Sequence, residues 1–168
     1  MRSRAGFTLI EVLIVMSIML ILSAVVYPQV IDLKIDTEGR AMAMPVRQVR
    51  EQIRLHAALA DYPLSVEGFP REIDPDWFPG RKLPRDLWTF RELKVQVVAG
   101  PKDATVPNKK TFNLKPDGTA AGHTAWYNKS NGAFCVKIPD KGSENRIQEL
   151  FQLANGSTGG SVGNGNGN

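Results

Sequence analysis

Apolar residues are concentrated at the start of the chain, where a long uncharged run follows a short polar segment. No residue between Glu11 and Asp32 is charged, and most are Ile, Leu, Val or Met. Twenty such residues rise about 30 Å as an α-helix, which matches the hydrocarbon thickness of a bilayer. The pattern predicts a membrane-spanning helix, and the two arginines within residues 1–6 place its N-terminus on the cytoplasmic side.

A second helical pattern covers residues 37–60, where apolar side chains recur at spacings of three and four with charges between them. This pattern predicts a helix that packs one face on a sheet and ends by residue 61. We expect distortion at Gly39 and Pro45, because both residue types are unfavourable inside helices. The apolar stripe consists of Val46, Val49, Ile53, Ala57 and Ala60.

Short alternating patterns predict strands in the second half of the chain, and the Asp117-Gly118 pair predicts a hairpin turn. Four short strands in order suggest an antiparallel meander. The last one should place Phe134, Val136 and Ile138 on one face, opposite Cys135 and Lys137. The predicted strands are residues 93–98, 111–114, 123–127 and 133–138.

The remaining segments differ in character. Residues 64–86 are rich in proline and have no sustained period, so they predict an irregular loop. Residues 146–155 predict a short amphipathic helix, and the Gly/Asn-rich residues 157–168 predict a disordered tail. We expect Trp126 and Phe112 to be core residues rather than platforms for a ligand.

Charge and candidate chemistry narrow the function classes. The net charge of +4 falls to +2 without residues 1–6, so nucleic-acid binding is not expected. A basic cluster of Lys102, Lys109, Lys110 and Lys115 has the character of a solvated face. Cys135 is the only cysteine, which excludes an intramolecular disulfide, and we expect it to be a half-buried packing residue.

No catalytic constellation is evident, so the sequence does not predict an enzyme. His56 lies on a predicted helix and His123 at the start of a strand, with no metal-ligand spacing between them. Asp140, Ser143 and Glu144 offer oxygen ligands suited to calcium. Their spacing matches no known binding loop and favours a solvated polar turn, so we expect no cofactor.

Glu11 is the residue that an ordinary targeting segment does not explain. A secretory signal peptide with a cleavage site near residues 22–24 and an uncleaved signal anchor both fit the apolar run. Neither accounts for a carboxylate within that run, which costs roughly 2.5 to 3.5 kcal/mol at a bilayer centre. A carboxylate inside a membrane span indicates a function.

The stretch Gly6-Phe7-Thr8-Leu9-Ile10-Glu11, which follows a basic leader and opens an apolar run, resembles the cleavage and methylation motif of type IV prepilins and type II secretion pseudopilins. The resemblance implies that a prepilin peptidase cuts between Gly6 and Phe7 and methylates the new amine of Phe7. It also implies a long N-terminal helix with its outer half packed on a small domain, and major pseudopilins often hold calcium in a C-terminal loop.

Cleavage at this site has a physical consequence for assembly. The new amine of Phe7 is cationic, and Glu11 of a neighbouring subunit supplies the opposite charge at a similar depth. Two unit charges about 4 Å apart attract by roughly 4 kcal/mol at an effective dielectric near 20. A subunit out of register leaves a buried carboxylate unpaired, so this pair sets the register between helices.

Two further features are similar to the family. Pro28 should kink the helix near the membrane exit, because it lacks a backbone donor, and the family carries a helix-bending proline at this place. Residues 81–88 partly match the Lys-Leu-Pro-Lys-Asp-Pro-Trp-Gly stretch of major pseudopilins. Leu87 and Thr89 depart from that pattern, which puts assignment to the major subunit in doubt.

Together these features predict an α+β protein with a long N-terminal helix against a small antiparallel sheet. The expected parts are a leader (1–6), a transmembrane assembly helix (7–31), a periplasmic pilin-like domain (32–156) and the tail (157–168). The resemblance implies a fibre subunit anchored by a single span in the bacterial inner membrane. Its implied partners are its own copies, prepilin peptidase, other pseudopilins, and the assembly platform with its ATPase. The alternative is a signal-anchored periplasmic binding module.

Overall fold

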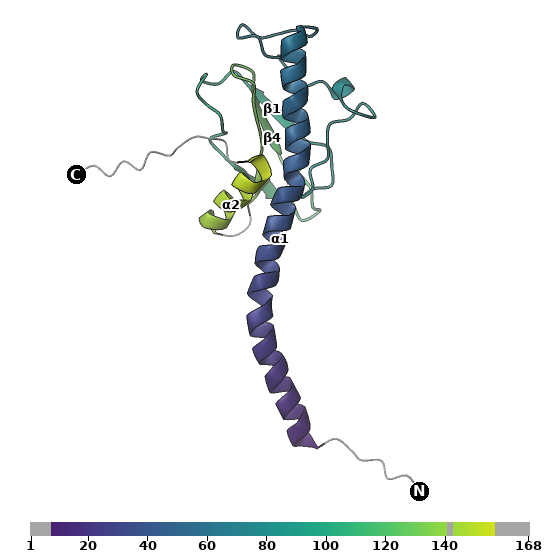
Figure 1. Cartoon of the computed structure of the whole chain (residues 1–168), viewed down its shortest axis with the longest axis vertical. Helices are drawn as coiled ribbons and strands as arrows, with labels where there is room; N and C mark the ends of the chain where they lie inside the picture. The colour runs from purple at the N-terminus through teal and green to yellow at the C-terminus, as the bar shows by residue number, and fades with distance from the viewer. Residues whose placement is uncertain (1–7, 141–142, 157–168) are drawn as a thin grey trace, which may run out of the picture. The chain divides into compact units, whose positions relative to one another are not determined.

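A computed structural model of the chain describes residues 8–140 and 143–156. These residues form an α+β protein that opens with one long helix, α1 (Leu9–Leu59), which confirms the predicted fold class (Figure 1). The chain divides into two units between Asp36 and Thr37, and each is described by itself. The predicted leader and tail lie outside the described residues.

Two three-stranded sheets and one further helix follow α1 in the second unit. In the first sheet β4 lies between β1 and β5, and in the second β2 lies between β3 and β6. Residues 64–86 are irregular as predicted, apart from the 3₁₀ turn η1 (Pro75–Trp77) and isolated bridges. The other elements are β1 (Val95–Val98), β2 (Thr111–Leu114), β3 (Ala120–Ala121), β4 (Ala125–Asn128), β5 (Ala133–Val136), β6 (Ile138–Pro139) and α2 (Glu144–Asn155).

The sheets are mixed, so the predicted antiparallel meander is wrong. The β4–β5 and β2–β3 pairs are antiparallel, and the second turns at Gly118 as predicted. In contrast, β1 pairs with β4 and β2 pairs with β6 in parallel. Parallel neighbours need a long connection. The β2–β3 hairpin supplies it between β1 and β4, since it lies in the chain between them.

The last predicted strand is split between the two sheets. Phe134 and Val136 of β5 face the core that includes α1, and Cys135 faces a second cluster, as the alternation predicts. Ile138, however, lies in that second cluster with Cys135. The chain leaves the first sheet after Val136 and pairs with β2 from Ile138 onward, so the alternation does not continue across residue 137.

The main core lies between the second half of α1 and the first sheet (Figure 1). Val46, Val49 and Ile53 of the predicted stripe are at most 1% exposed, whereas Ala57 is half-buried and Ala60 is exposed. The helix ends at Leu59, close to the predicted position. Phe112 and Trp126 are buried, as predicted. Tyr127, Phe134 and Val136 supply the facing side of the core, and Met42 extends the helical side.

Close packing of α2 explains why Gly39 lies inside a helix. The structure assigns α1 as helical through Gly39 and Pro45. A side chain at Gly39 would put its Cβ 2.6 Å from Leu153 Cβ, so α2 requires a glycine at this position. The helix α2 begins two residues before the predicted range and ends at Asn155, and Gly156 after it has a positive φ of 71°, which favours glycine.

Two polar side chains fix α2 to the rest of the second unit. Asn155 accepts a hydrogen bond from the Val136 N–H at 2.8 Å and donates one to the Val136 carbonyl at 3.0 Å, which completes the edge of β5. Arg50 of α1 donates to the Asn155 carbonyl at 2.6 Å and to the Phe134 carbonyl at 2.9 Å. This guanidinium satisfies a carbonyl at the C-terminus of α2, where a cation is favourable.

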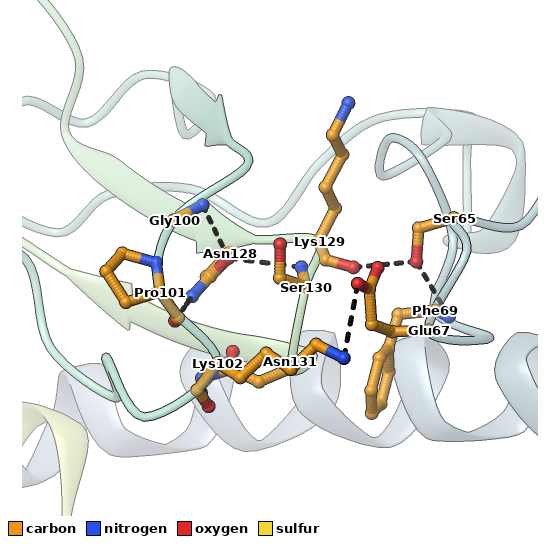
Figure 2. Close-up of polar contacts among 10 residues, drawn as sticks. All are labelled: Ser65, Glu67, Phe69, Gly100, Pro101, Lys102, Asn128, Lys129, Ser130 and Asn131. Atoms are coloured by element: carbon orange, nitrogen blue, oxygen red, sulfur yellow. Dashed lines mark hydrogen bonds and ion pairs between the residues drawn. The ribbon is translucent and has the colours of Figure 1, made fainter.

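Asn128, at the end of β4, joins the loop after β1 to the turn between β4 and β5 (Figure 2). Its side-chain oxygen accepts from the N–H groups of Gly100 and Ser130, both at 3.1 Å. Its amide nitrogen donates to the carbonyls of Pro101 at 2.9 Å and Ala104 at 3.2 Å. The side chain is fully buried, so these backbone groups depend on it in place of water.

We expect Asn128→Ala to lower the stability of the protein by about 2–3 kcal/mol, because it leaves buried backbone groups without partners. The corresponding fall in Tm is roughly 5–10 °C. Thermal unfolding of the detergent-solubilised full-length protein measures the change. Asn113→Ala is the matched control, since Asn113 is exposed on β2 and its loss should matter little. Equal effects of the two variants would contradict the role of Asn128.

Candidate processing and assembly site

The start of α1 is organised by a hydrogen-bonded pair, Thr8 and Glu11. The Glu11 carboxylate accepts from the Thr8 N–H at 2.8 Å and from the Thr8 hydroxyl at 3.0 Å. The Glu11 N–H lies 3.4 Å from the Thr8 hydroxyl and 3.1 Å from the Thr8 carbonyl. This reciprocal arrangement is a capping box, which satisfies N–H groups that a helix N-terminus leaves unpaired.

The apolar run after this cap has no partner within the first unit. Every side chain from Leu9 to Tyr27 is exposed, including Leu20 at 72% and Leu9 at 81%. Among the described residues, this is the one helix segment long and apolar enough to cross a membrane, with a mean hydropathy of 2.8. Ser17 donates to the carbonyl of Leu13 at 2.8 Å, so its hydroxyl is satisfied inside its own helix.

The predicted site residues are only partly described. Gly6 and Phe7, the predicted cleavage pair, lie outside the described residues, and so does the predicted methylation site at Phe7. Glu11 lies three residues after the helix cap, where its carboxylate is exposed. The α1 assignment continues through Pro28, so the kink predicted there stays a prediction.

This arrangement caps the helix and leaves part of the Glu11 carboxylate available to a further donor. Within its own chain the carboxylate closes the helix N-terminus, where a negative charge is favourable. Its side chain has further acceptor capacity, because an ionised carboxylate offers about four lone-pair sites and Thr8 occupies two of them. An amine from a neighbouring chain therefore has room to bind the same carboxylate.

Comparison with known proteins bears on this segment. The family model of the prokaryotic N-terminal methylation motif matches residues 1–27. Comparisons with curated proteins and with solved structures find no match. The motif is that of type IV prepilins and pseudopilins, so the resemblance noted in the sequence is confirmed.

The motif indicates a type IV pilin-like protein that prepilin peptidase processes. Together with the apolar helix, it is consistent with a single-pass anchor in the inner membrane. The match covers the cleavage region, Glu11 and the apolar run up to Tyr27. It therefore indicates a prepilin-type processing motif and does not distinguish a secretion pseudopilus from a pilus.

The lysines of the predicted basic cluster have separate local surroundings. Lys102 pairs with Glu67 at 3.6 Å. Lys110 donates to Gln148 at 2.9 Å and lies 5.4 Å from the centre of the Phe151 ring. Lys109 has no such contact and lines a separate cavity beside β1. These lysines do not act as one charged face, and nucleic-acid binding stays outside our expectation.

Cys135 is fully buried, not half-buried as predicted. Burial raises the pKa of its thiol, an effect that the nearby Arg50 guanidinium partly opposes. The sulfur donates a weak hydrogen bond to the Thr105 carbonyl at 3.4 Å. A thiol that is buried and protonated is a packing residue.

The histidines and the candidate oxygen ligands form no metal-binding group in the part of the chain that the structure describes. His56 stacks on Trp77, with ring centroids 4.1 Å apart, and contacts Asp61 at 2.9 Å, whereas His123 is exposed. Within the described ranges, no group of three or more His, Cys, Asp or Glu side chains could hold a metal ion. The loop between Asp140 and Ser143 includes residues outside those ranges, so the expectation that no cofactor binds there stays a prediction.

Sequence reasoning found Glu11 but missed the role of Thr8. The signal was present, because Thr-x-x-Glu before an apolar run is the sequence form of a capping box. The free-energy cost of placing this carboxylate in a membrane indicated a role for its charge but not its role as a helix cap. The structure adds that the same side chain fixes the first turn of the assembly helix.

Proposed function

We propose that the protein is a structural subunit of a fibre of the type II secretion pseudopilus or type IV pilus class, with protein secretion as the favoured role. The observation that supports this most directly is Glu11, a carboxylate held at the start of an exposed apolar helix within a processing motif. In a plain anchor this carboxylate would only cap the helix N-terminus, a role that needs no charge. In a fibre it pairs with the processed amine of the next subunit.

The proposal also covers the cellular location of the protein and its partners in assembly. Prepilin peptidase removes residues 1–6, the span holds the subunit in the inner membrane, and the second unit lies in the periplasm. An assembly platform and its ATPase then stack the helices, with other pseudopilins as neighbours. The role is non-enzymatic and needs no cofactor. Similarity of residues 81–88 to the loop of major pseudopilins favours the secretion role.

Intact mass and N-terminal sequencing of the protein extracted from native membranes test this proposal. We expect a chain that starts at Phe7, carries one added methyl group and retains the apolar helix. A chain that still starts at Met1, or one cut near Ala24, would contradict the proposal. Either result would favour the signal-anchored or secreted binding module.

A further inference from the structure

An exposed aromatic residue stands at the tip of a tightly ordered loop. Phe90 is 77% exposed and has a φ of 54°, a left-handed conformation that is costly for a residue with a side chain. The loop is closed at its base, where the Asp86 N–H donates to the Arg91 carbonyl at 2.7 Å. Phe90 is therefore held outward by the fold around it.

The buried carboxylate of Asp86 maintains this loop. It accepts from the Trp88 N–H at 3.0 Å and from the Thr89 hydroxyl at 2.9 Å. Burial raises the pKa of Asp86, and these hydrogen bonds oppose that shift. A buried carboxylate and a strained backbone thus hold one aromatic side chain exposed to solvent, away from the cores that the described residues form. Aromatic residues, Phe included, are enriched at protein–protein interfaces.

A receptive cavity lies beside the C-terminal part of β1 and the loop that follows this strand. It has a volume of about 350 Å³ and a mixed lining, whose apolar part includes Val98, Ala104, Val106 and Trp126. Its wall is held in place by the Asn128 side chain, which donates to the carbonyl of Pro101 (Figure 2) and to that of Ala104, both lining residues. The cavity is therefore preformed for an apolar group.

Two lysines lie beside this apolar lining without an acidic partner. Lys137 donates to the neutral Gln96 at 2.9 Å. Burial lowers the pKa of Lys137, and the nearby charge of Lys109 lowers it further. Lys109 lines the same cavity and is exposed. An apolar group that enters with an adjacent carboxylate would fill the cavity and relieve this repulsion.

The Phe90 loop carries such a carboxylate. Glu92 is exposed, and its carboxylate lies 4.0 Å from the Lys82 ammonium, which is a weak surface ion pair. Arg91 lies between Phe90 and Glu92 in the chain. Its acidic neighbour is Asp117, because the Arg91 charge helps to lower the pKa of that carboxylate. The loop therefore presents an aromatic ring and an available negative charge, which complement the cavity.

The loop and the cavity lie at opposite ends of the same elements. Phe90 precedes β1, whereas the cavity includes Gly100 and Pro101, which follow it. Likewise, Arg91 is near Asp117, past the end of β2, whereas Lys109 precedes β2. A contact between two copies through these surfaces is head-to-tail. Such contacts repeat without closing and generate open helical filaments.

We propose that Phe90 of one copy inserts into the cavity beside Trp126 of the next copy, with Glu92 facing Lys109 and Lys137. This inference rests on the proposed function, because a fibre subunit meets its own copies in a repeating array. It adds a contact between the second units to the pairing of the helices. The preformed loop and cavity reduce the entropy that each contact loses on assembly.

Cysteine crosslinking of the full-length protein in native membranes tests the contact. The variant Arg91→Cys with Asn108→Cys puts one thiol beside Phe90 and one at the cavity rim and keeps Phe90 itself. After oxidation with copper phenanthroline we expect a ladder of covalent oligomers, as head-to-tail contacts require. Each single variant should give no ladder beyond a dimer. The wild-type chain measures the background from Cys135, which is buried.

A second pair of variants tests whether the crosslinked oligomers depend on the Phe90 side chain. Adding Phe90→Ala should reduce it at least tenfold, whereas adding Val66→Ala should leave it unchanged. Val66 is the matched control, because it is 99% exposed on a different loop. Both side chains are exposed, so neither variant should alter thermal unfolding. Equal effects of the two substitutions would overturn the proposal.

Charge reversal gives an independent readout. Lys109→Glu should weaken the ladder several-fold, and adding Glu92→Lys to the same chain should restore part of it, because the pair of positions 92 and 109 then attracts with the opposite polarity while Lys137 is unchanged. Absence of rescue would overturn the proposal. If fibres of processed, methylated chains form but give no ladder, the Phe90 contact is wrong and the proposed function stands. If the chains are neither processed nor assembled, both fail.

Discussion

A chain carrying Gly6→Val is expected to keep its six-residue leader, to lack the methyl group, and to stay in the membrane without entering fibres. The peptidase must bind the backbone around the scissile bond closely, and a glycine leaves room for that approach, whereas a β-branched residue fills it. Without cleavage, the nitrogen of Phe7 stays an uncharged amide. The register pair with Glu11 of the next subunit then cannot form.

Intact mass of membrane extracts and the sedimentation of sheared fibres measure the two consequences. The matched control is Ser3→Val, which makes a comparable change inside the leader but away from the cleavage pair. It should be cut and assembled normally. A Gly6→Val chain that is processed as efficiently as the control would show that the peptidase does not act at this bond.

The helical parts of the fold could be predicted from the sequence, because their signals are local. The spacing of Val46, Val49 and Ile53 puts them on one face of any helix, whatever surrounds it. All three are buried in the structure. The same holds for the Asp117-Gly118 turn. Both segments are specified by neighbours within a few residues, so no knowledge of the distant chain was required.

The pairing of strands could not be predicted in the same way. Alternation shows that residues 95–98 form a strand, but it does not show which strand lies beside it. The parallel partner of Val95 is Ala125, thirty positions later in the chain. The choice depends on how the intervening hairpin packs and on polar contacts such as those of Asn128 and Asn155, which hold distant segments together.

The candidate site also has one part that the sequence predicts and another that depends on the folded chain. Glu11 could be identified because a charge inside an apolar run is conspicuous in any sequence. Phe90 carried no such signal, since an aromatic residue in a polar loop is most often buried. Its exposure follows from a left-handed backbone and a carboxylate buried beneath the loop, which only the folded chain reveals.

Glu11→Gln is expected to abolish fibre assembly while leaving the start of α1 intact. A capping box accepts either Glu or Gln at this position, so the glutamine keeps the hydrogen bonds to Thr8 and removes only the charge. The attraction to a processed amine, roughly 4 kcal/mol at 4 Å and an effective dielectric near 20, is then lost. A loss of that size corresponds to a weakening of more than a hundredfold.

Two comparisons separate the charge of Glu11 from its local role. Thr8→Val removes the hydroxyl of the cap but keeps the carboxylate, so we expect fibres at a moderately reduced yield, because a lost cap costs about 1 kcal/mol. Ser17→Ala, the control for a polar change within the span, should assemble normally. The yield of sheared fibres is the measurement for all three variants. If Glu11→Gln assembles as well as Thr8→Val, then helix capping explains the residue and the intersubunit charge pair does not exist.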